Sequence, residues 1–298
     1  MRKFMTNKWI IILFALIICN SANAQSRRGR HTRRKGSLPR KEVKETRPSD
    51  IVISKPENEN KPESHPVSSV RTYTVNGVSF NMVHVQGGNF KMGATQEQAE
   101  LSDDNESPVH NVTLTSFMIG QTEVTQELWT AVMRENPSIR PGEQMPVDNI
   151  SWDDCQAFIL KLNQMTGQQF HLPTEAQWEY AAKGGHKHST TIFSGADLSS
   201  TVGWCDLNSE GKTHIVGTKA PNTLGIYDMT GNIQEWCEDW YGIYEDTAQT
   251  NPSGATSGAF RILRGGSWGQ DSRFCRVTYR SRDTPNHRGA FYGMRLAL

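Results

Sequence analysis

The residues best suited to chemistry lie in the stretch RGGSWGQDSRFC, residues 264–275. Ser267 supplies a hydroxyl and Cys275 a thiol, and both follow the pair Gly265-Gly266. Two thiols in such a stretch would suit a soft metal ion such as copper(I), which prefers thiolate ligands. Gln270 stands where a second thiol would be useful, and its side chain is a neutral, hard amide. The stretch therefore offers such an ion one soft ligand, the Cys275 thiol, in place of two.

The remaining thiols leave several roles open. Four cysteines follow residue 24, namely Cys155, Cys205, Cys237 and Cys275, and their wide spacing excludes the close CxxC pairs of a structural zinc site. One or two disulfides are allowed in an oxidising compartment, with three complete pairings possible, and buried free thiols are also common. Any of the other three cysteines could lie beside Cys275, because sequence separation does not fix distance in space. We expect a structural role for Cys155, which falls on the apolar side of a predicted helix.

The first 24 residues have the three parts of a secretory signal: a basic start, an apolar run at 9–18 and the small-residue site Ala22-Asn23-Ala24. We expect cleavage after Ala24 and export to the periplasm or cell surface. The apolar run is shorter than the ~20 residues that a transmembrane helix needs, so no membrane span is expected. Cys19 could be lipidated, but the bulky residue before it favours plain cleavage.

Residues 25–70 are predicted to be a basic, disordered arm. Residues 25–47 carry ten Lys or Arg against two Glu, and the segment lacks the apolar content that would offset the entropy of ordering. The chain has a net charge of +1; since the signal contributes +3 and residues 25–47 contribute +8, residues 48–298 carry −10. Such an arm can contact an anionic surface or serve as a solvated tether, and in an exported protein nucleic acid is not the expected partner.

Residues 71–298 are predicted to form a single α+β domain with few regular elements. Asn76-Gly77 between two alternating apolar runs is typical of a two-residue hairpin turn. Helix caps are predicted at Thr125, Ser151 and Thr174, the last completed by Gln177 as a capping box, with stops before Pro137, at Gly167 and at Gly184-Gly185. No helical period continues after Gly185, so the last hundred residues are expected to be turns, loops and short strands.

Several spaced blocks occur in order over residues 81–298: GGNFKMG, MPVDNISWDDCQAF, HLPTEAQWEYAAKGG, YDMTGNIQEWCEDWY, LRGGSW and YGMRLAL. This set resembles the formylglycine-generating enzyme, or sulfatase-modifying factor, family. The resemblance implies that family's variant of the C-type-lectin-like fold, which has long loops and little regular secondary structure.

The resemblance also implies a chemistry that this chain departs from. Type members oxidise the cysteine of a sulfatase CxPxR segment to formylglycine with molecular oxygen and a copper(I) ion held by two cysteines five residues apart, after Gly-Gly-Ser. Ser267 and Cys275 match this motif, but Gln270 occupies the place of the first copper cysteine. An amide would bind copper(I) far more weakly than a thiolate. Copper is therefore not expected as a cofactor, and oxidase activity is in doubt.

The stretch YDMTGNIQEW resembles the calcium loop of the same family. The resemblance implies that Asp228, Gly231, Ile233 and Glu235 would supply side-chain and backbone oxygens, the ligands that calcium prefers. A turn whose acidic side chains are merely solvated is the alternative. Calcium is the cofactor that we expect.

The family's substrate groove runs past the same Gly-Gly-Ser motif, and the residues expected in it here are Trp268, Asp271 and Arg276. The arginines that flank Cys275 could bind an anionic group, although arginines at this density usually form salt bridges.

Three functions remain to be compared. The first is an exported binding or assembly module without copper oxidase chemistry, whose partner would be a protein, a peptide or a cell-envelope component. The second is a formylglycine-generating oxidase with an altered ligand set. The third is a non-haem iron sulfoxide synthase, which shares this domain but needs a His-rich helical domain ahead of it. Gln270 and the basic arm favour the first.

Overall fold

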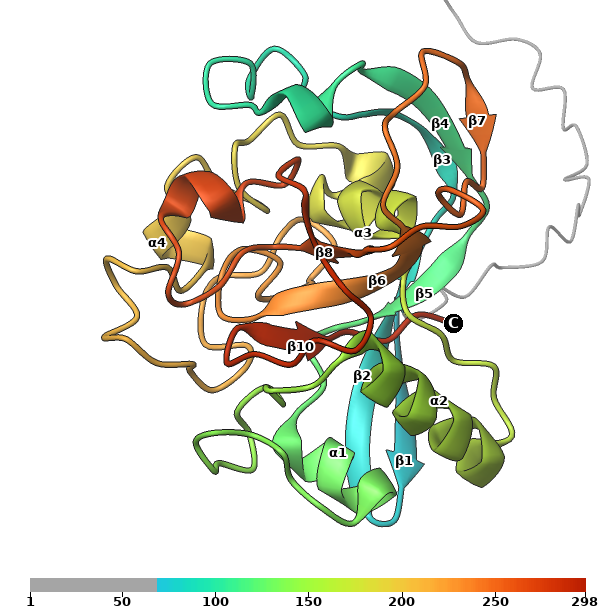
Figure 1. Ribbon diagram of the computed structural model, residues 1–298, viewed down its shortest axis with the longest axis vertical. Coiled ribbons are helices and arrows are strands. Elements are labelled where there is room, and N and C mark those ends of the chain that lie inside the picture. The colour runs from blue at the N-terminus through green and yellow to red at the C-terminus, as the bar shows by residue number, and fades with distance from the viewer. Residues whose placement is uncertain (1–68) are drawn as a thin grey trace, which may run out of the picture. The chain divides into compact units, whose positions relative to one another are not determined.

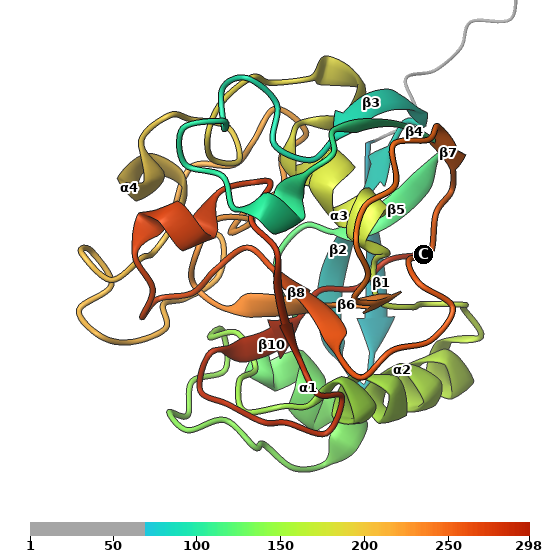
Figure 2. The same ribbon diagram turned by 45° about the horizontal axis from the view of Figure 1, so that its top comes forward.

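The computed structural model describes residues 69–298, which form a mixed α and β domain with long connections, as expected (Figures 1 and 2). The predicted signal peptide and nearly all of the predicted basic arm lie outside the described residues. The first strand begins at Val70, one residue before the predicted start of the domain. No helix in residues 69–298 combines the length and apolar character needed to cross a bilayer.

The first sheet has the order β1-β2-β5, with β1 at Val70–Val75, β2 at Val78–Val85 and β5 at Phe117–Gly120. Strands β1 and β2 form the predicted hairpin: Val75 pairs with Val78, and Asn76 and Gly77 between them have positive φ angles of 48° and 84°. Two successive residues with positive φ match the right-handed twist of the strands, which explains the Asn-Gly sequence at this turn.

Two longer helices cover this hairpin (Figure 1). Helix α1 (Gln126–Met133) is capped by Thr125, whose side chain accepts a hydrogen bond from Leu128 N. Helix α2 (Trp152–Thr166) begins with a capping box at Ser151 and ends at Gly167 in the left-handed conformation. Both predicted starts are confirmed. The helices and the hairpin enclose one apolar core, which includes Cys155 with no exposed surface.

A second sheet has the order β3-β4-β7, with β3 at Gly88–Met92, β4 at His110–Leu114 and β7 at Gln249–Thr250. Helix α3 (Glu175–Ala182) lies between this sheet and the central sheet in both views (Figures 1 and 2). The predicted Thr174–Gln177 capping box starts the helix. Side chains from α3 and both sheets form the second apolar core.

The central sheet has the order β10-β6-β8-β9. Its strands are β6 at Gln234–Trp240, β8 at Arg261–Arg264, β9 at Ser281–Asp283 and β10 at Tyr292–Met294. Side chains two residues apart on β6 share one face of the sheet. Glu235, Cys237 and Asp239 are therefore on one face, and all three are buried. This sheet positions both the Gly-Gly-Ser turn after β8 and the predicted calcium loop before β6.

The last hundred residues contain the expected short strands and turns, together with α4 (Ser199–Val202) and the 3-10 turn η3 (Ser272–Cys275). Two further 3-10 turns, η1 (Asp104–Glu106) and η2 (Gly185–Lys187), lie earlier in the chain. Helix α4 was not expected, because four residues are too few to show a helical period. Residues 270–275 lie on a turn and η3, so the two aligned metal positions do not lie on one strand.

Candidate functional site

The Gly-Gly-Ser motif forms a tight turn directly after β8. Gly265 and Gly266 have φ angles of 88° and 70°, in the left-handed region that glycine adopts without strain. A Cβ on Gly266 would lie 2.4 Å from Cys275 Sγ and 2.6 Å from Phe274 O. Glycine is therefore required at position 266 because the chain folds back onto itself and brings Cys275 under the turn.

The Cys275 thiol is enclosed by this turn. The residue has no exposed surface and lies in a small apolar cluster with Phe193, Val202 and Cys205. Its sulfur is 3.9 Å from the carbonyl oxygens of Ser267 and Asp271. The neighbouring Cys205 thiol and burial hold the pKa of the Cys275 thiol well above its usual range. Cys275 is thus a neutral, buried thiol.

Cys205 is the cysteine that lies beside Cys275, one of the three possibilities left open by the sequence. Cys155 belongs to the core under α2, and Cys237 belongs to the core around α3. All four described cysteines are free thiols.

Gln270 stabilises the turn. Ser267 Oγ donates a hydrogen bond to Gln270 Oε1 at 3.2 Å, and Asp206 N donates to Gln270 O at 3.0 Å. Gln270, at the place of the first copper cysteine, is therefore hydrogen bonded to the motif serine through its side-chain amide and to the loop that carries Cys205 through its backbone carbonyl.

The three expected groove residues lie in different surroundings. Trp268 is half-buried, packs against Phe291 with the two rings tilted and 4.8 Å between their centroids, and lines a pocket of about 120 Å³. Asp271 is exposed and accepts a hydrogen bond from Arg273 N at the start of η3. Arg276 does not line a groove: its exposed fraction is 1%, and its guanidinium binds both carboxylate oxygens of Glu106 at 2.5 and 2.9 Å. The expectation for Arg276 was wrong because a buried carboxylate 170 positions earlier in the chain, from η1, pairs with it.

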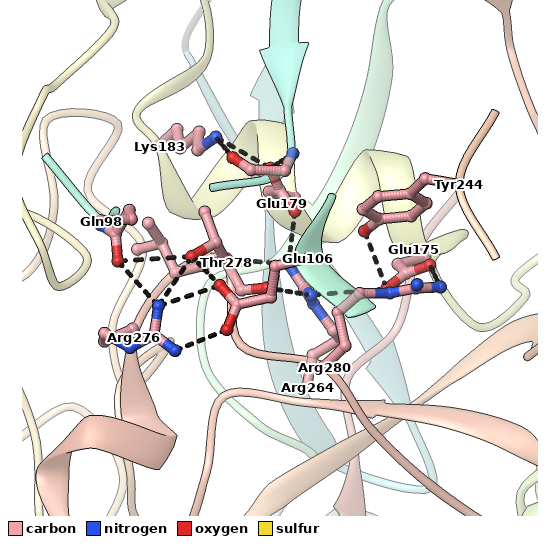
Figure 3. A network of polar contacts seen from close by, with 12 residues as sticks. Gln98, Glu106, Glu175, Glu179, Lys183, Tyr244, Arg264, Arg276, Thr278 and Arg280 are labelled. Carbon is pink, nitrogen blue, oxygen red and sulfur yellow. Dashed lines mark hydrogen bonds and ion pairs between the residues drawn. The ribbon is translucent and has the colours of Figure 1, made fainter. Parts of the chain in front are cut away.

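Arg276 belongs to a buried network of arginines and carboxylates (Figure 3). Arg280 binds Glu175 through two contacts of 2.6 and 2.8 Å, and Arg264 reaches Glu179 at 2.7 Å. Coulombic attraction to Arg280 and Arg264, with hydrogen bonds, outweighs burial and lowers the pKa of Glu175. These arginines therefore hold the domain together, in line with the salt-bridge alternative.

The predicted calcium residues are close together in the fold but engaged differently. Glu235 is fully buried: Arg295 binds its two oxygens at 2.6 and 2.9 Å, and Trp178 Nε1 donates to it at 2.7 Å. Asp228 Oδ2 accepts a hydrogen bond from Gly217 N at 2.6 Å, whereas its buried Oδ1 has no partner. Burial raises the pKa of Asp228 to about 6.

This arrangement does not fit calcium. A guanidinium already neutralises Glu235, and a divalent cation beside it would be repelled by Arg295. Of the two predicted side-chain ligands, Glu235 is engaged with Arg295 and only Asp228 Oδ1 is unpartnered, whereas calcium needs six to eight oxygens. Gly231 also has a structural reason to be glycine, because a Cβ there would lie 2.1 Å from Trp204 O. Within residues 69–298 no group of three His, Cys, Asp or Glu side chains is arranged to hold a metal ion.

The structure also has a polar cleft of about 360 Å³ that the sequence did not predict. Two members of the arginine network, Glu175 and Arg280, line it. It is lined by residues from β4, α3, β6 and the following loop, among them His110, Glu175, Asp239, Ile243, Tyr244 and Arg280. Asp239 accepts a hydrogen bond from Glu175 N at 2.9 Å, and burial, followed by the charge of Glu175, raises the pKa of Asp239 to about 8. A cleft with convergent polar groups and a perturbed carboxyl is the usual character of a binding site.

Comparisons with known proteins bear on this geometry. The Sulfatase-modifying factor enzyme 1-like domain matches residues 66–298. The chain is 31% identical to "Chaperone protein LppX" of Paenibacillus barcinonensis over 74% of this chain and 89% of that protein. It is 27% identical to the formylglycine-generating enzyme of Streptomyces coelicolor over 72% and 88% of the two chains.

Among solved structures, "Treponema denticola variable protein 1" superposes with a TM-score of 0.71 at 33% identity, covering 78% of this chain and 99% of that one. The expected fold is confirmed. The chain belongs to the family of the Sulfatase-modifying factor enzyme 1-like domain, of which the formylglycine-generating enzymes are members.

Proposed function

We propose that this chain is a protein-binding member of its family that works at the cell envelope without formylglycine-generating oxidation. The observation that carries the proposal is the state of Cys275. This residue aligns with a copper cysteine of the family, yet it has no exposed surface and is a neutral thiol under the Gly-Gly-Ser turn. A substrate cysteine must come into contact with the reacting centre, and here the turn backbone closes over the sulfur.

The residues at the family's two copper positions also favour a function without oxidation. The family's two thiolates come from positions that correspond here to Gln270 and Cys275. The Gln270 amide is engaged with Ser267 and offers copper(I) a hard, neutral donor in place of sulfur.

The surface suited to binding is the cleft beside Glu175 and Asp239. Its volume of about 360 Å³ is within the range of ligand sites, and its rim carries Ile243, whose side chain is 88% exposed. An exposed aliphatic side chain beside convergent hydrogen-bonding groups suits a segment of a partner protein that has both apolar and polar side chains. The relative from P. barcinonensis is named a chaperone protein, which agrees with a protein ligand. The secretory pattern at the N-terminus is the basis for the envelope location.

Peptide oxidation is the primary test. The purified chain, supplied with copper(I), reductant and oxygen, should leave the cysteine of a CxPxR peptide unchanged by mass spectrometry, while the S. coelicolor enzyme in parallel converts it to an aldehyde. Conversion by the wild-type chain that disappears in Cys275→Ser would overturn the proposal.

A second candidate is a formylglycine-generating oxidase in which Cys205 supplies the missing thiol, because Cys205 and Cys275 lie in the same buried cluster. The same assay separates the two functions. Activity that is lost in Cys205→Ser and kept in Cys155→Ser would favour the oxidase.

Binding is tested by the suppression of light scattering from unfolded citrate synthase. The wild-type chain should reduce scattering at equimolar ratio, and Ile243→Asp should lose most of this effect. Leu207→Asp is the matched control, since Leu207 is 91% exposed and does not line the cleft. Equal loss in both variants, or no suppression by the wild type, would contradict binding at this cleft.

A further inference from the structure

The loop that carries Cys205 and the turn that covers Cys275 are fastened to each other on both sides of the two thiols. Asp206 N donates to Gln270 O at 3.0 Å, and Ser209 Oγ donates to Trp268 O at 2.7 Å. Asn232 adds a shared support, because its N donates to Trp204 O at 2.8 Å and its O accepts from Trp268 N at 2.9 Å. The closeness of the two sulfurs is therefore set by the backbone.

The two thiols lie together in one apolar cluster. Cys205 is 3% exposed and Cys275 is fully buried, with Phe193 and Val202 packed against them. The carbonyl contacts of Cys275 Sγ at 3.9 Å are long for hydrogen bonds even to sulfur. The two thiols thus pack in one cluster between fastened backbone segments, and the other polar contacts of Cys275 Sγ are weak. This arrangement suits the formation of a disulfide.

We propose that Cys205 and Cys275 are a redox pair that closes to a disulfide and ties the loop at 203–211 to the Gly-Gly-Ser turn. The oxidant is a disulfide of another molecule, such as glutathione disulfide or a protein disulfide. One cysteine attacks this disulfide as the thiolate and expels one thiol, and the second cysteine then attacks the mixed disulfide and expels the other. Two S–H bonds are lost, one S–S bond forms, and the oxidant takes up two electrons and two protons.

Cys205 is the cysteine that reacts first with the oxidant. Burial keeps the pKa of the Cys275 thiol high, so little thiolate exists there in the closed state. Cys205 lies in a loop whose next two residues, Asp206 and Leu207, are exposed. Opening of this loop exposes Cys205 first, and Cys275 then completes the bond from within. Only one member of the pair, Cys275, stands at a position that aligns with a copper cysteine of the family; the other, Cys205, lies 70 positions earlier.

The test uses the purified full chain, first reduced and then incubated with glutathione disulfide. Peptide mapping under non-reducing conditions should show a Cys205–Cys275 cross-link in most molecules. Oxidation should raise Tm by roughly 5–10 °C, because the cross-link restricts the unfolded chain. Dithiothreitol should reverse the shift, and Cys205→Ala should not show it. Cys155→Ala and Cys237→Ala are the matched controls and should show both the cross-link and the shift.

Full alkylation of both thiols after oxidation and unfolding would overturn the inference, as would a cross-link that includes Cys155 or Cys237. Stoichiometric copper that copurifies on the Cys205–Cys275 pair would also overturn it. The mapping of wild-type protein decides the matter even if a cysteine variant folds poorly. Peptide oxidation is scored separately, so this inference and the proposed function can fail independently.

Discussion

The turn around Cys275 and the cleft around Asp239 are the two regions of this domain with reactive side chains, and they differ in exposure and charge. The turn is apolar, closed and built around two buried thiols. The cleft is open and lined by carboxyl groups, a tyrosine and an arginine. The motif that aligns with the family's catalytic residues is thus in the region least able to meet a substrate. The comparison teaches that sequence position within a motif and access to solvent are separate properties.

The arginine network between the two regions supports both of them (Figure 3). Arg264 binds Glu179 at 2.7 Å and Val277 O at 2.8 Å, and therefore joins α3, on the cleft side, to the segment that follows Cys275. If the two regions depend on one scaffold, removal of this arginine should destabilise both at once.

Arg264→Met is expected to have the largest effect, a loss of about 3–5 kcal/mol in the free energy of unfolding, because Glu179 and Glu175 would lose a buried partner. Urea denaturation followed by tryptophan fluorescence measures it. Arg273→Met is the control: its side chain is 52% exposed and its carboxylate partner is 3.5 Å away, so the change should be below about 1 kcal/mol. Similar losses in the two variants would mean that the network is not the shared scaffold.

Gly266→Ala tests whether the turn is truly closed over Cys275. The new Cβ would meet Cys275 Sγ at 2.4 Å and would also force alanine to a φ of 70°. We expect a loss of about 2–4 kcal/mol from overpacking and backbone strain together. Gly211→Ala isolates the backbone part, because φ is 68° there and nothing lies within 4 Å of the added atom. The difference between the two variants, measured by urea denaturation, reports the closeness of the packing around the sulfur.

Local parts of the fold were predictable from sequence, and long-range parts of the site were not. The capping box at Ser151 and the Asn76-Gly77 turn involve residues within four positions of one another, so their sequence pattern is sufficient. The contact between Cys205 and Cys275 depends on how two loops pack, which no local pattern encodes.

Calcium binding stays a prediction, and the surroundings of its expected ligands were not predictable from sequence for a similar reason. Spacing alone identified Glu235, but its partner Arg295 arrives from the C-terminal segment, 60 positions later. The cleft shows the same limit: Asp239 and Glu175 come from β6 and α3 and meet only in the folded chain. Glu175 gave no signal beyond that of a first-turn helix residue.

Asp239 should make the cleft sensitive to pH, unlike the turn. Its pKa is raised from 3.8 to about 8, so the folded protein holds this proton more tightly than the unfolded chain. The contribution to stability is therefore complete below pH 3.8 and is lost as pH rises to 8. Asp239→Asn should remove this loss and raise stability at pH 8 by about 2 kcal/mol, less than the full shift implies because the amide NH₂ needs an acceptor of its own.

The measurement is the free energy of unfolding between pH 4 and 8. Asp246→Asn changes an exposed carboxyl next to the cleft and should keep the wild-type slope. A wild-type curve that rises over this interval, with the same slope in Asp239→Asn, would mean that the cleft carboxyl titrates like an exposed one.

Calcium is expected to have the smallest effect, because Arg295 already neutralises Glu235 in the aligned loop. Addition of calcium after chelation should change Tm by less than about 1 °C, since a ligand stabilises a protein only by binding its folded state. A Tm that rises with calcium concentration in the wild type but not in Asp228→Asn would contradict this. Such a result would mean that the ion displaces Arg295 from Glu235, and Asp228 Oδ1, which has no partner now, would then be a ligand. The variant is informative in either case: if Asp228 is only a buried carboxyl with a raised pKa, its neutralisation should not alter the response to calcium.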